Sequence, residues 1–360
     1  MPKCWTAAPC PSPCWRRRST AGSRRGRAKA VSAILVTGVA GFIGYHVARR
    51  LLERGESVVG IDNFTPYYAL DLKRARIAAL PQDRFRLIET DFADAEGLGR
   101  ALSGVDFDRI VHLGAQPGVR YSIDHPLAYA HSNLTGHLVM LETARHRAVA
   151  HLVYASSSSV YGGNASLPFR VEDRADQPIS LYAATKKADE LISETYSHLY
   201  RLPQTGLRFF TVYGPWGRPD MAVWTFTRKI LRGEPIDVFG HGDMRRDFTF
   251  IDDIVAGVIA ALDNPPPDDG RPKAGGSVGP HRLYNIGNNK SEELGRLIDV
   301  IEAACGRKAE RVLKPMQPGD VRDTYADISA IEADLGYRPV TSIEAGVPRF
   351  VDWYRQHDFL

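Results

Sequence analysis

Cysteine is scarce in this 360-residue sequence, and three of its four cysteines, Cys4, Cys10 and Cys14, lie within the first 30 residues. Because only Cys305 remains in the rest of the chain, a disulfide scaffold is excluded and a reducing, cytoplasmic location is expected. No Cys/His pair near Cys10 and Cys14 completes a ligand set, so we expect no metal site. Apolar runs of the roughly 18 residues that span a bilayer are also missing, so we expect no membrane partner.

Acidic residues are missing from residues 1–30, which contain eight Lys and Arg residues but no apolar periodicity. This composition predicts a disordered tail. The tail lacks the continuous apolar region of a secretory signal. A transit peptide, a misassigned start and a solvated arm are the remaining interpretations. The tail contributes +8 to a net charge of +4, so residues 31–360 carry −4. A mildly acidic body does not indicate nucleic acid as a partner.

From residue 33 onward, short apolar runs alternate with helical patterns. This alternation predicts an α/β fold, with a doubly wound parallel-sheet Rossmann domain and a smaller, mostly C-terminal α/β substrate domain. We expect the Rossmann domain at residues 31–212, rejoined by about 246–288, and the substrate domain at 213–245 and 289–360. Strands are expected at 33–37, 58–61, 85–88, 109–113, 151–155, 206–211 and 283–286. The clearest helical patterns are 42–54, 225–231, 291–305 and 343–356, and the Pro/Gly-rich stretch 264–282 predicts an exposed loop.

Three glycines follow the first predicted strand, in Thr37-Gly-Val-Ala-Gly-Phe-Ile-Gly44. Gly38 permits a tight turn, Gly41 lets the backbone approach a pyrophosphate, and Gly44 permits close packing of helix on sheet. The helix N-terminus then offers free amides to phosphates. Asp62, after the second strand, can hold a ribose diol and would repel a 2′-phosphate, which favours NAD over NADP. Asp91, after the third strand, can hold the adenine amino group. Ordinary loop carboxylates are the alternative for both aspartates.

The glycine spacing resembles that of the extended short-chain dehydrogenase/reductase family, also called the NAD-dependent epimerase/dehydratase family. That resemblance implies a Tyr-x-x-x-Lys motif after the fifth strand, and Tyr182-Ala-Ala-Thr-Lys186 is present. Residues four apart share a helix face. Lys186 can therefore reach the nicotinamide ribose and the neighbourhood of the Tyr182 hydroxyl. Positive charge there favours the phenolate, so Tyr182 is the expected base. A surface Tyr/Lys pair is the alternative.

Four serines close the fifth strand, in Tyr154-Ala-Ser-Ser-Ser-Ser-Val-Tyr-Gly162. The family resemblance assigns Ser157 the hydrogen bond to the reacting sugar oxygen. Nucleotide-sugar 4,6-dehydratases resemble this segment but have Asp-Glu at the positions of Ser158 and Ser159. UDP-glucuronate decarboxylases have Glu at the Ser159 position. The hydroxyls in this chain therefore favour an epimerase.

The chain most resembles the UDP-glucuronate 4-epimerases, and the resemblance covers nearly all of residues 31–357. It is carried by the segments His112–Ser122, Phe209–Met221, Met244–Asp253 and Gln317–Asp320. Gly114 and Pro117 depart from the family's usual His-Leu-Ala-Ala-Gln-Ala-Gly-Val-Arg. UDP-galactose 4-epimerases have Asn where Thr211 stands, and the smaller side chain makes room for a C5 carboxylate. Arg218 is a candidate to hold that carboxylate, although a surface loop arginine is the alternative.

The resemblance implies a catalytic set, a cofactor, a substrate and a homodimer. The catalytic residues would be Tyr182, Lys186 and Ser157. NAD would be held by Gly38, Gly41, Phe42, Ile43, Gly44, Asp62, Asn63, Asp91, Phe92, Leu113, Gly114, Ala115, Gln116, Asn133, Tyr182 and Lys186. The UDP-sugar would be held by Arg120, Ser158, Ser159, Thr211, Arg218, Arg246 and Asp320.

The expected function is the interconversion of UDP-glucuronate and UDP-galacturonate through a transient 4-keto sugar. One alternative is a 4-epimerase of another UDP-sugar, either UDP-glucose/galactose or an N-acetylhexosaminuronate. The other is a catalytically silent NAD-binding regulator, against which the intact Ser157, Tyr182 and Lys186 argue.

Overall fold

The computed structural model of the chain describes residues 32–317 and 320–357, so the predicted disordered tail lies outside the described residues. The strands are β1 (Ala33–Thr37), β2 (Val58–Asp62), β3 (Phe85–Glu89), β4 (Phe107–His112), β5 (His151–Ser157), β6 (Gln204–Phe209), β7 (Thr211–Tyr213), β8 (Ile236–Val238), β9 (Arg245–Phe250), β10 (His281–Ile286), β11 (Ser291–Glu293) and β12 (Arg311–Leu313). The helices are α1 (Phe42–Glu53), α2 (Leu70–Ala78), α3 (Ala95–Ala101), α4 (Tyr121–Asp124), α5 (Pro126–Tyr129), α6 (Gly136–Arg147), α7 (Leu181–Tyr200), α8 (Ala222–Arg232), α9 (Ile251–Asp263), α10 (Leu294–Cys305), α11 (Ser329–Leu335) and α12 (Ile343–Gln356).

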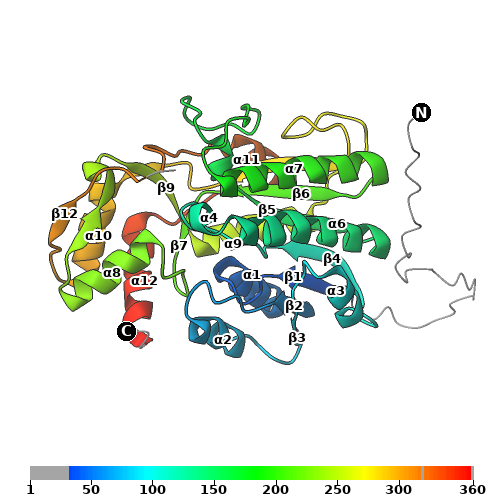
Figure 1. Cartoon of the computed structure of the whole chain (residues 1–360), viewed down its shortest axis with the longest axis horizontal. Coiled ribbons are helices and arrows are strands. Elements are labelled where there is room, and N and C mark those ends of the chain that lie inside the picture. The colour runs from blue at the N-terminus through cyan, green and yellow to red at the C-terminus, as the bar shows by residue number, and fades with distance from the viewer. Residues whose placement is uncertain (1–31, 318–319, 358–360) are drawn as a thin grey trace, which may run out of the picture. The chain divides into compact units, whose positions relative to one another are not determined.

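A parallel sheet in the order β10-β6-β5-β4-β1-β2-β3 organises the described part of the chain. Helices cover both of its faces. On one face α6 packs on β4 and α7 on β5 and β6, and Figure 1 shows α6 and α7 side by side. On the other face α1 and α9 pack together against β1, β2, β5 and β6. The predicted doubly wound α/β fold is confirmed.

The side chains of β1 alternate between the two layers of the core. Ile34 and Val36 join the cluster that includes α1 and α9, whereas Leu35 joins the cluster that includes α6. Since both faces of the strand are covered by helices, every residue of β1 is buried. This two-sided burial explains why the strand has a continuous apolar sequence rather than an alternating one.

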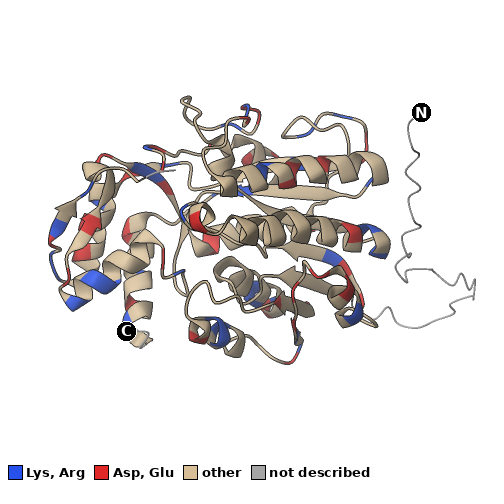
Figure 2. Ribbon diagram, viewed as in Figure 1, with Lys and Arg blue, Asp and Glu red and all other residues tan. Residues whose placement is uncertain are grey.

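A smaller part of the fold stands beside the C-terminal ends of the central strands. It contains the sheet β11-β9-β7 and the pair β12-β8, and α10 packs on α8 and α12. Figure 1 shows α8, α10, α12 and β12 together at the left of the molecule. Basic and acidic residues are interspersed along the helices of both parts (Figure 2). The division at residues 212, 246 and 288 stays a prediction.

Two predicted elements differ from the structure. The expected strand 206–211 is wrong as one element, because the chain leaves the central sheet after Phe209 and Thr211 pairs with Phe248 of β9 instead. The helix predicted from residue 291 begins at Leu294, since Ser291–Glu293 pair antiparallel with β9 as β11. Both errors come from β9, whose pairing depends on residues about 40 positions away. Among the described residues, no helix is both long enough and apolar enough to cross a bilayer.

Candidate active site

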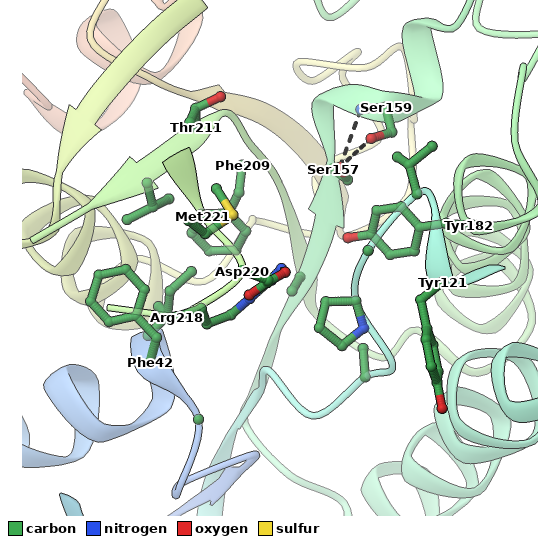
Figure 3. A pocket seen from close by; sticks show the side chains of 18 of the residues that line it. Phe42, Tyr121, Ser157, Ser159, Tyr182, Phe209, Thr211, Arg218, Asp220 and Met221 are labelled. Carbon is green, nitrogen blue, oxygen red and sulfur yellow. Dashed lines mark hydrogen bonds and ion pairs between the residues drawn. The ribbon is translucent and has the colours of Figure 1, made fainter. Parts of the chain in front are cut away.

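A cavity of about 670 Å³ opens at the C-terminal ends of β1, β2, β4 and β5. In doubly wound sheets ligands bind at this edge, where the strand order reverses. β7, β9 and the loop that leads to α8 line the opposite wall. The cavity therefore connects the glycine-rich turn, the serine run and the substrate-side residues in one continuous space (Figure 3).

The glycine-rich turn is shaped to admit a diphosphate. Gly38 has φ +68°, and a Cβ there would lie 2.8 Å from the backbone of Gly114. A Cβ at Gly44 would collide with the carbonyl of Gly38, so the first turn of α1 lies directly on the turn. α1 begins after Gly41 without a side-chain cap in the described structure. Its first amides are thus available to phosphate oxygens, which fits the pyrophosphate of a dinucleotide.

The two predicted adenosine-binding carboxylates occupy different settings. Asp62 lies at the end of β2, accepts hydrogen bonds from the amides of Ala40 (3.1 Å) and Phe64 (2.9 Å), and faces Lys73 Nζ at 3.8 Å. It lines the cavity, as predicted for a ribose partner. Lys73 was not predicted, because an isolated lysine in a helical pattern carries no signal of its contact.

Asp91 lies in the loop that follows β3, and two neighbouring residues bind its carboxylate. Its carboxylate contacts His131 Nε2 at 2.9 Å and accepts a hydrogen bond from the amide of Ala93 at 2.8 Å. Burial opposes ionisation, but these bonds outweigh it and lower the pKa of Asp91. Asp91 is therefore a carboxylate with fixed orientation, suited to an amino group.

Tyr182 and Lys186 are one turn apart on α7, as predicted. Ser180 caps the helix by accepting from the amide of Ala183 at 3.1 Å, which places Tyr182 in the first turn. Figure 3 shows the Tyr182 hydroxyl pointing into the cavity. Lys186 is buried, and its Nζ donates to the carbonyl of Ala155 (3.1 Å) and to Asp189 Oδ2 (3.0 Å). Asp189 was not predicted.

The four serines have separate environments. Ser156 is buried and donates to Glu190 Oε1 at 2.7 Å. Ser157 and Ser159 hydrogen-bond each other at 3.1 Å, so their hydroxyls lie beside Tyr182 at the top of the cavity (Figure 3). Ser158 also lines the cavity. All four serines thus line the cavity, but the hydroxyl of Ser156 is bound to α7 through Glu190.

Arg218 and Thr211 line the opposite wall of the cavity, and their contact with a substrate stays a prediction. Arg218 is paired with Asp220: Nη2 lies 2.6 Å from Oδ2, and Nε lies 3.0 Å from Oδ1. Tyr67 also donates to Asp220 Oδ2 at 3.1 Å. Burial opposes the charge on Arg218, but Asp220 outweighs it and raises the pKa of Arg218. Asp220 uses Nε and Nη2, so Nη1 is the donor that faces no carboxylate of this pair.

The residues predicted to hold UDP are together but are bound to one another and to the backbone. Arg120 Nη2 lies 3.0 Å from Asp320 Oδ2. Arg246 donates to the carbonyls of Val321 (2.6 Å) and Arg322 (2.8 Å). Burial lowers the pKa of Arg246. Asp320 is described, whereas residues 318–319 of the predicted Gln317–Asp320 motif lie outside the described residues.

Gly114, which departs from the family's alanine, is matched by Phe92. A Cβ at Gly114 would lie 2.5 Å from Phe92 Cε1 and 3.1 Å from Thr37 Oγ1. The phenyl ring thus fills the space that an alanine methyl would need. Pro117, the second departure, accepts a hydrogen bond from the hydroxyl of Tyr129 at 2.8 Å.

Asn133 is buried and supports the same loop from behind. Its Oδ1 accepts from the amide of Gln116 at 2.8 Å, and its Nδ2 donates to Thr185 Oγ1 on α7 at 3.0 Å. Asn133 therefore ties the loop after β4 to the catalytic helix, and its direct contact with a cofactor stays a prediction. The other predicted cofactor contacts Phe42, Ile43, Asn63, Leu113, Ala115 and Gln116 line the cavity.

The sequence profile of the family described as GDP-mannose 4,6 dehydratase matches residues 35–350. The chain belongs to this family.

Relatives of this family member include a probable UDP-glucuronate 4-epimerase of Rhizobium meliloti (strain 1021). That protein is 47% identical over 330 residues, which cover 90% of this chain and 97% of the relative. UDP-glucuronate 4-epimerase 3 of Arabidopsis thaliana is 45% identical over 347 residues, which cover 95% of this chain and 80% of the relative. Among solved structures, the UDP-glucuronic acid 4-epimerase of Bacillus cereus in complex with UDP-glucuronic acid and NAD is similar. Its TM-score is 0.79 at 33% identity, and the match covers 90% of this chain and 99% of that one.

Proposed function

We propose that this chain is an NAD-dependent 4-epimerase that interconverts UDP-glucuronate and UDP-galacturonate through a transient 4-keto sugar. The observation that carries the proposal is the set of groups around the Tyr182 hydroxyl. Ser158 and Ser159 line the cavity at the positions where the family resemblance implies that an elimination would need an acid pair, and Ser157 hydrogen-bonds Ser159. The named 4-epimerases at 45% and 47% identity, and the solved one with UDP-glucuronic acid and NAD, support the same reading.

NAD fits the residues at one end of the cavity. The open glycine-rich turn would hold the pyrophosphate, and Asp62 would hold the adenosine ribose, in keeping with NAD rather than NADP. Lys186 would contact the nicotinamide ribose. Bound NAD+ would accept hydride from C4 of the sugar and return it. The chain's own side chains therefore need only move the matching proton and fix the geometry.

The proton moves through Tyr182. Its hydroxyl oxygen, as phenolate, takes the proton from the C4 hydroxyl and later returns it to the C4 oxygen on the other face of the sugar. Lys186 favours the phenolate by its charge. Ser157 donates a hydrogen bond to the C4 oxygen, which stabilises negative charge as the proton leaves. Between the two transfers the sugar must rotate about its link to UDP.

The sugar carboxylate is the feature that separates this substrate from UDP-glucose. We propose that Arg218 Nη1, Thr211, Ser158 and Ser159 bind it, since all four residues line the cavity. A 4-keto acid of this kind loses carbon dioxide when its carboxylate stands perpendicular to the carbonyl plane. Several donors that fix the carboxylate in another orientation would prevent that loss.

The UDP end is assigned to Arg120, Arg246 and Asp320. Arg246 would contact the diphosphate and Asp320 a ribose hydroxyl. Because Arg120 and Asp320 now contact each other at 3.0 Å, nucleotide binding would exchange that ion pair for contacts with the ligand. Such exchange preserves the number of charged contacts while admitting the nucleotide.

We also propose a homodimer formed through α6 and α7. Leu127, Leu138, Leu191 and Leu199 are 81%, 43%, 59% and 60% exposed on and beside these helices. If these exposed leucines form one contiguous patch, the patch favours a protein–protein interface. The proposed location is the cytoplasm, where Cys305 would stay reduced.

The substrate is tested by incubating the full chain with UDP-glucuronate, UDP-glucose and a UDP-N-acetylhexosaminuronate in separate reactions. We expect rapid 4-epimerisation of UDP-glucuronate and at least tenfold lower kcat/KM for the other two. Preference for UDP-glucose would identify a neutral-sugar epimerase. Failure with all three, with NAD still bound, would identify a silent NAD-binding protein.

A further inference from the structure

We propose that Asp189 is a positioning residue that controls how much of the Lys186 charge acts on Tyr182, and so sets the acid limit of catalysis. The proposal rests on the proposed function, because it concerns the base of that reaction. It goes beyond the Tyr-x-x-x-Lys motif, which does not include position 189.

The geometry places a second charge directly on the catalytic lysine. Asp189 follows Lys186 by three residues on α7, and its Oδ2 accepts from Nζ at 3.0 Å. Both side chains are buried, at 0% exposure for Asp189 and 4% for Lys186. Within the described part of the chain, Oδ1 of Asp189 is buried without a hydrogen-bond partner. Lys186 has a second partner in the carbonyl of Ala155.

A carboxylate with an unpaired, buried oxygen is an unfavourable choice if its only role is structural. Burying an ion pair contributes little net stability, because desolvation offsets the attraction. A neutral asparagine could accept the same bond from Lys186 and donate another. The charge at position 189 therefore points to an effect on Lys186 rather than on packing.

The other groups around Asp189 leave Lys186 as its counter-charge. Glu190, the next residue of α7, is neutralised by Arg208 through bonds of 2.7 and 2.9 Å. His137 of α6 bonds Ser193, and burial lowers the pKa of His137 to about 3, so this ring is neutral at pH 7.

Two titratable groups of the sheet also interact with this pair, Tyr154 with Asp189 and His112 with Lys186. Tyr154 of β5 contacts His281 Nε2 at 2.9 Å, and burial raises the pKa of Tyr154 well above its usual value. His112 of β4 contacts Thr37 Oγ1, and burial lowers the pKa of His112 well below its usual value. Both are neutral at the pH of catalysis, so neither competes with Lys186.

Asp189 can then change charge within the working range of the protein. Burial raises the pKa of Asp189 to about 6, although Lys186 opposes the shift. Above that pH the pair is neutral overall, and the pull of Lys186 on the Tyr182 phenolate is offset. Below it, Asp189 is protonated, the full ammonium charge acts on Tyr182, and the phenolate is favoured as protons become abundant. Asp189 would thus extend catalysis toward acid.

The test compares the pH dependence of kcat, from pH 5 to 9, in the NAD-bound wild type and in Asp189→Asn. The asparagine mimics the protonated state at every pH. Asp189 and Tyr182 are seven residues apart, about 10 Å along the helix. At an effective dielectric of 20 the part of the acid limb above pH 6 should therefore move down by up to about one pH unit. Below pH 6 the two profiles should converge, because Asp189 is then protonated in the wild type as well. Glu194→Gln is the matched control, because it removes a carboxylate five residues further along α7, and its profile should follow that of the wild type.

A second readout does not depend on activity. Carbon-13 NMR of aspartate carboxyl groups in the holoenzyme should show one resonance, absent from Asp189→Asn, that titrates near pH 6. If Asp189→Asn does not fold, Asp189→Ser removes the charge with less demand on packing and is read in the same way. Superimposable profiles, or a carboxyl that titrates below pH 4, would overturn the proposal. A wild type that binds NAD but converts no UDP-sugar would contradict the proposed function alone, since the NMR titration would still report on Asp189.

Discussion

The guanidinium of Arg218 forms a bidentate ion pair with the carboxylate of Asp220, with Nη2–Oδ2 and Nε–Oδ1 distances of 2.6 and 3.0 Å. The hydroxyl of Tyr67 donates a hydrogen bond of 3.1 Å to Oδ2 of the same carboxylate. Asp220 therefore orients Arg218 before any substrate arrives, and a substrate carboxylate would meet a cation whose direction is already fixed. Such preorganisation favours binding of a second carboxylate at Nη1 without further ordering of the side chain.

Replacing Arg218 by Ala should weaken the binding of UDP-glucuronate far more than the binding of UDP-glucose. Losing one charge-assisted hydrogen bond costs about 1.5–3 kcal/mol, or roughly ten- to a hundredfold in affinity. Dissociation constants measured by calorimetry on the NAD-bound protein check this. Arg174→Ala, on an exposed loop, is the control. Equal losses for both nucleotides would show that Arg218 serves the diphosphate or the fold.

The Arg218→Ala variant should also release more carbon dioxide during turnover than the wild type does. Once the carboxylate is free to turn, the 4-keto acid should decarboxylate more often, so UDP-pentose products should rise relative to UDP-galacturonate. Ser158→Ala should show the same change more weakly, because it removes a neutral donor. Product analysis by mass spectrometry measures this ratio. An unchanged product ratio in Arg218→Ala would show that Arg218 does not control the orientation of the carboxylate.

Tyr182→Phe should abolish epimerisation while NAD stays bound. The substitution removes the hydroxyl that takes the proton, but leaves Lys186 and the glycine-rich turn intact. Turnover is measured together with the NAD content of the purified protein. Retention of more than a few per cent of activity would exclude Tyr182 as the base.

Gly114 and Phe92 should be energetically coupled. Gly114→Ala would place a methyl group 2.5 Å from Phe92 Cε1, and such overpacking costs about 1–3 kcal/mol. Phe92→Leu shortens the opposing side chain. The double variant should therefore lose less unfolding free energy than the two single variants lose when their losses are added. A double-mutant cycle by urea unfolding measures this coupling. Strict additivity would mean that the backbone, rather than Phe92, dictates glycine at this position.

Acid should destabilise the fold through buried histidines, of which His151 gives the clearest test. His151 contacts the carbonyl of Leu262 (3.1 Å) and Thr205 Oγ1 (3.0 Å), and burial lowers the pKa of His151 to about 4. A group whose pKa is lowered on folding contributes stability above its unfolded value of about 6.5, and this contribution is lost as the pH falls toward 4.

The wild type should therefore lose about 1 kcal/mol from His151 between pH 7 and pH 5.5. His151→Gln, which keeps polar groups but does not titrate in this range, should reduce the pH dependence of the unfolding free energy by that amount. Urea unfolding at the two pH values measures it. The same pH dependence in both proteins would mean that the pKa of His151 does not change on folding.

Sequence patterns predict the Rossmann part of the fold well, because its signals are local. β1, α1 and the turn between them follow from one apolar run and three glycines, and Tyr182 and Lys186 follow from the helical period. The pairing of β9 with β7 and β11 could not be predicted, since it depends on contacts between residues far apart in sequence. Phe92, which fits against Gly114, was predicted only as a cofactor contact for the same reason.

The charge partners of the site were also beyond prediction. Asp189 and Asp220 look like ordinary polar positions in a helix and a loop, and only the fold shows that one contacts Lys186 and the other Arg218. Sequence patterns identified Lys186 and Arg218, which line the cavity, whereas the carboxylates that contact them had no pattern of their own.

The central claim, transient oxidation and return of hydride at the same carbon, is tested most directly with UDP-glucuronate that carries deuterium at C4. The product is isolated after incubation with the NAD-bound protein in ordinary water, and its deuterium is measured by NMR and mass spectrometry. We expect UDP-galacturonate that keeps the deuterium at C4, without accumulation of NADH. Loss of deuterium to solvent, or the absence of UDP-galacturonate, would contradict the account.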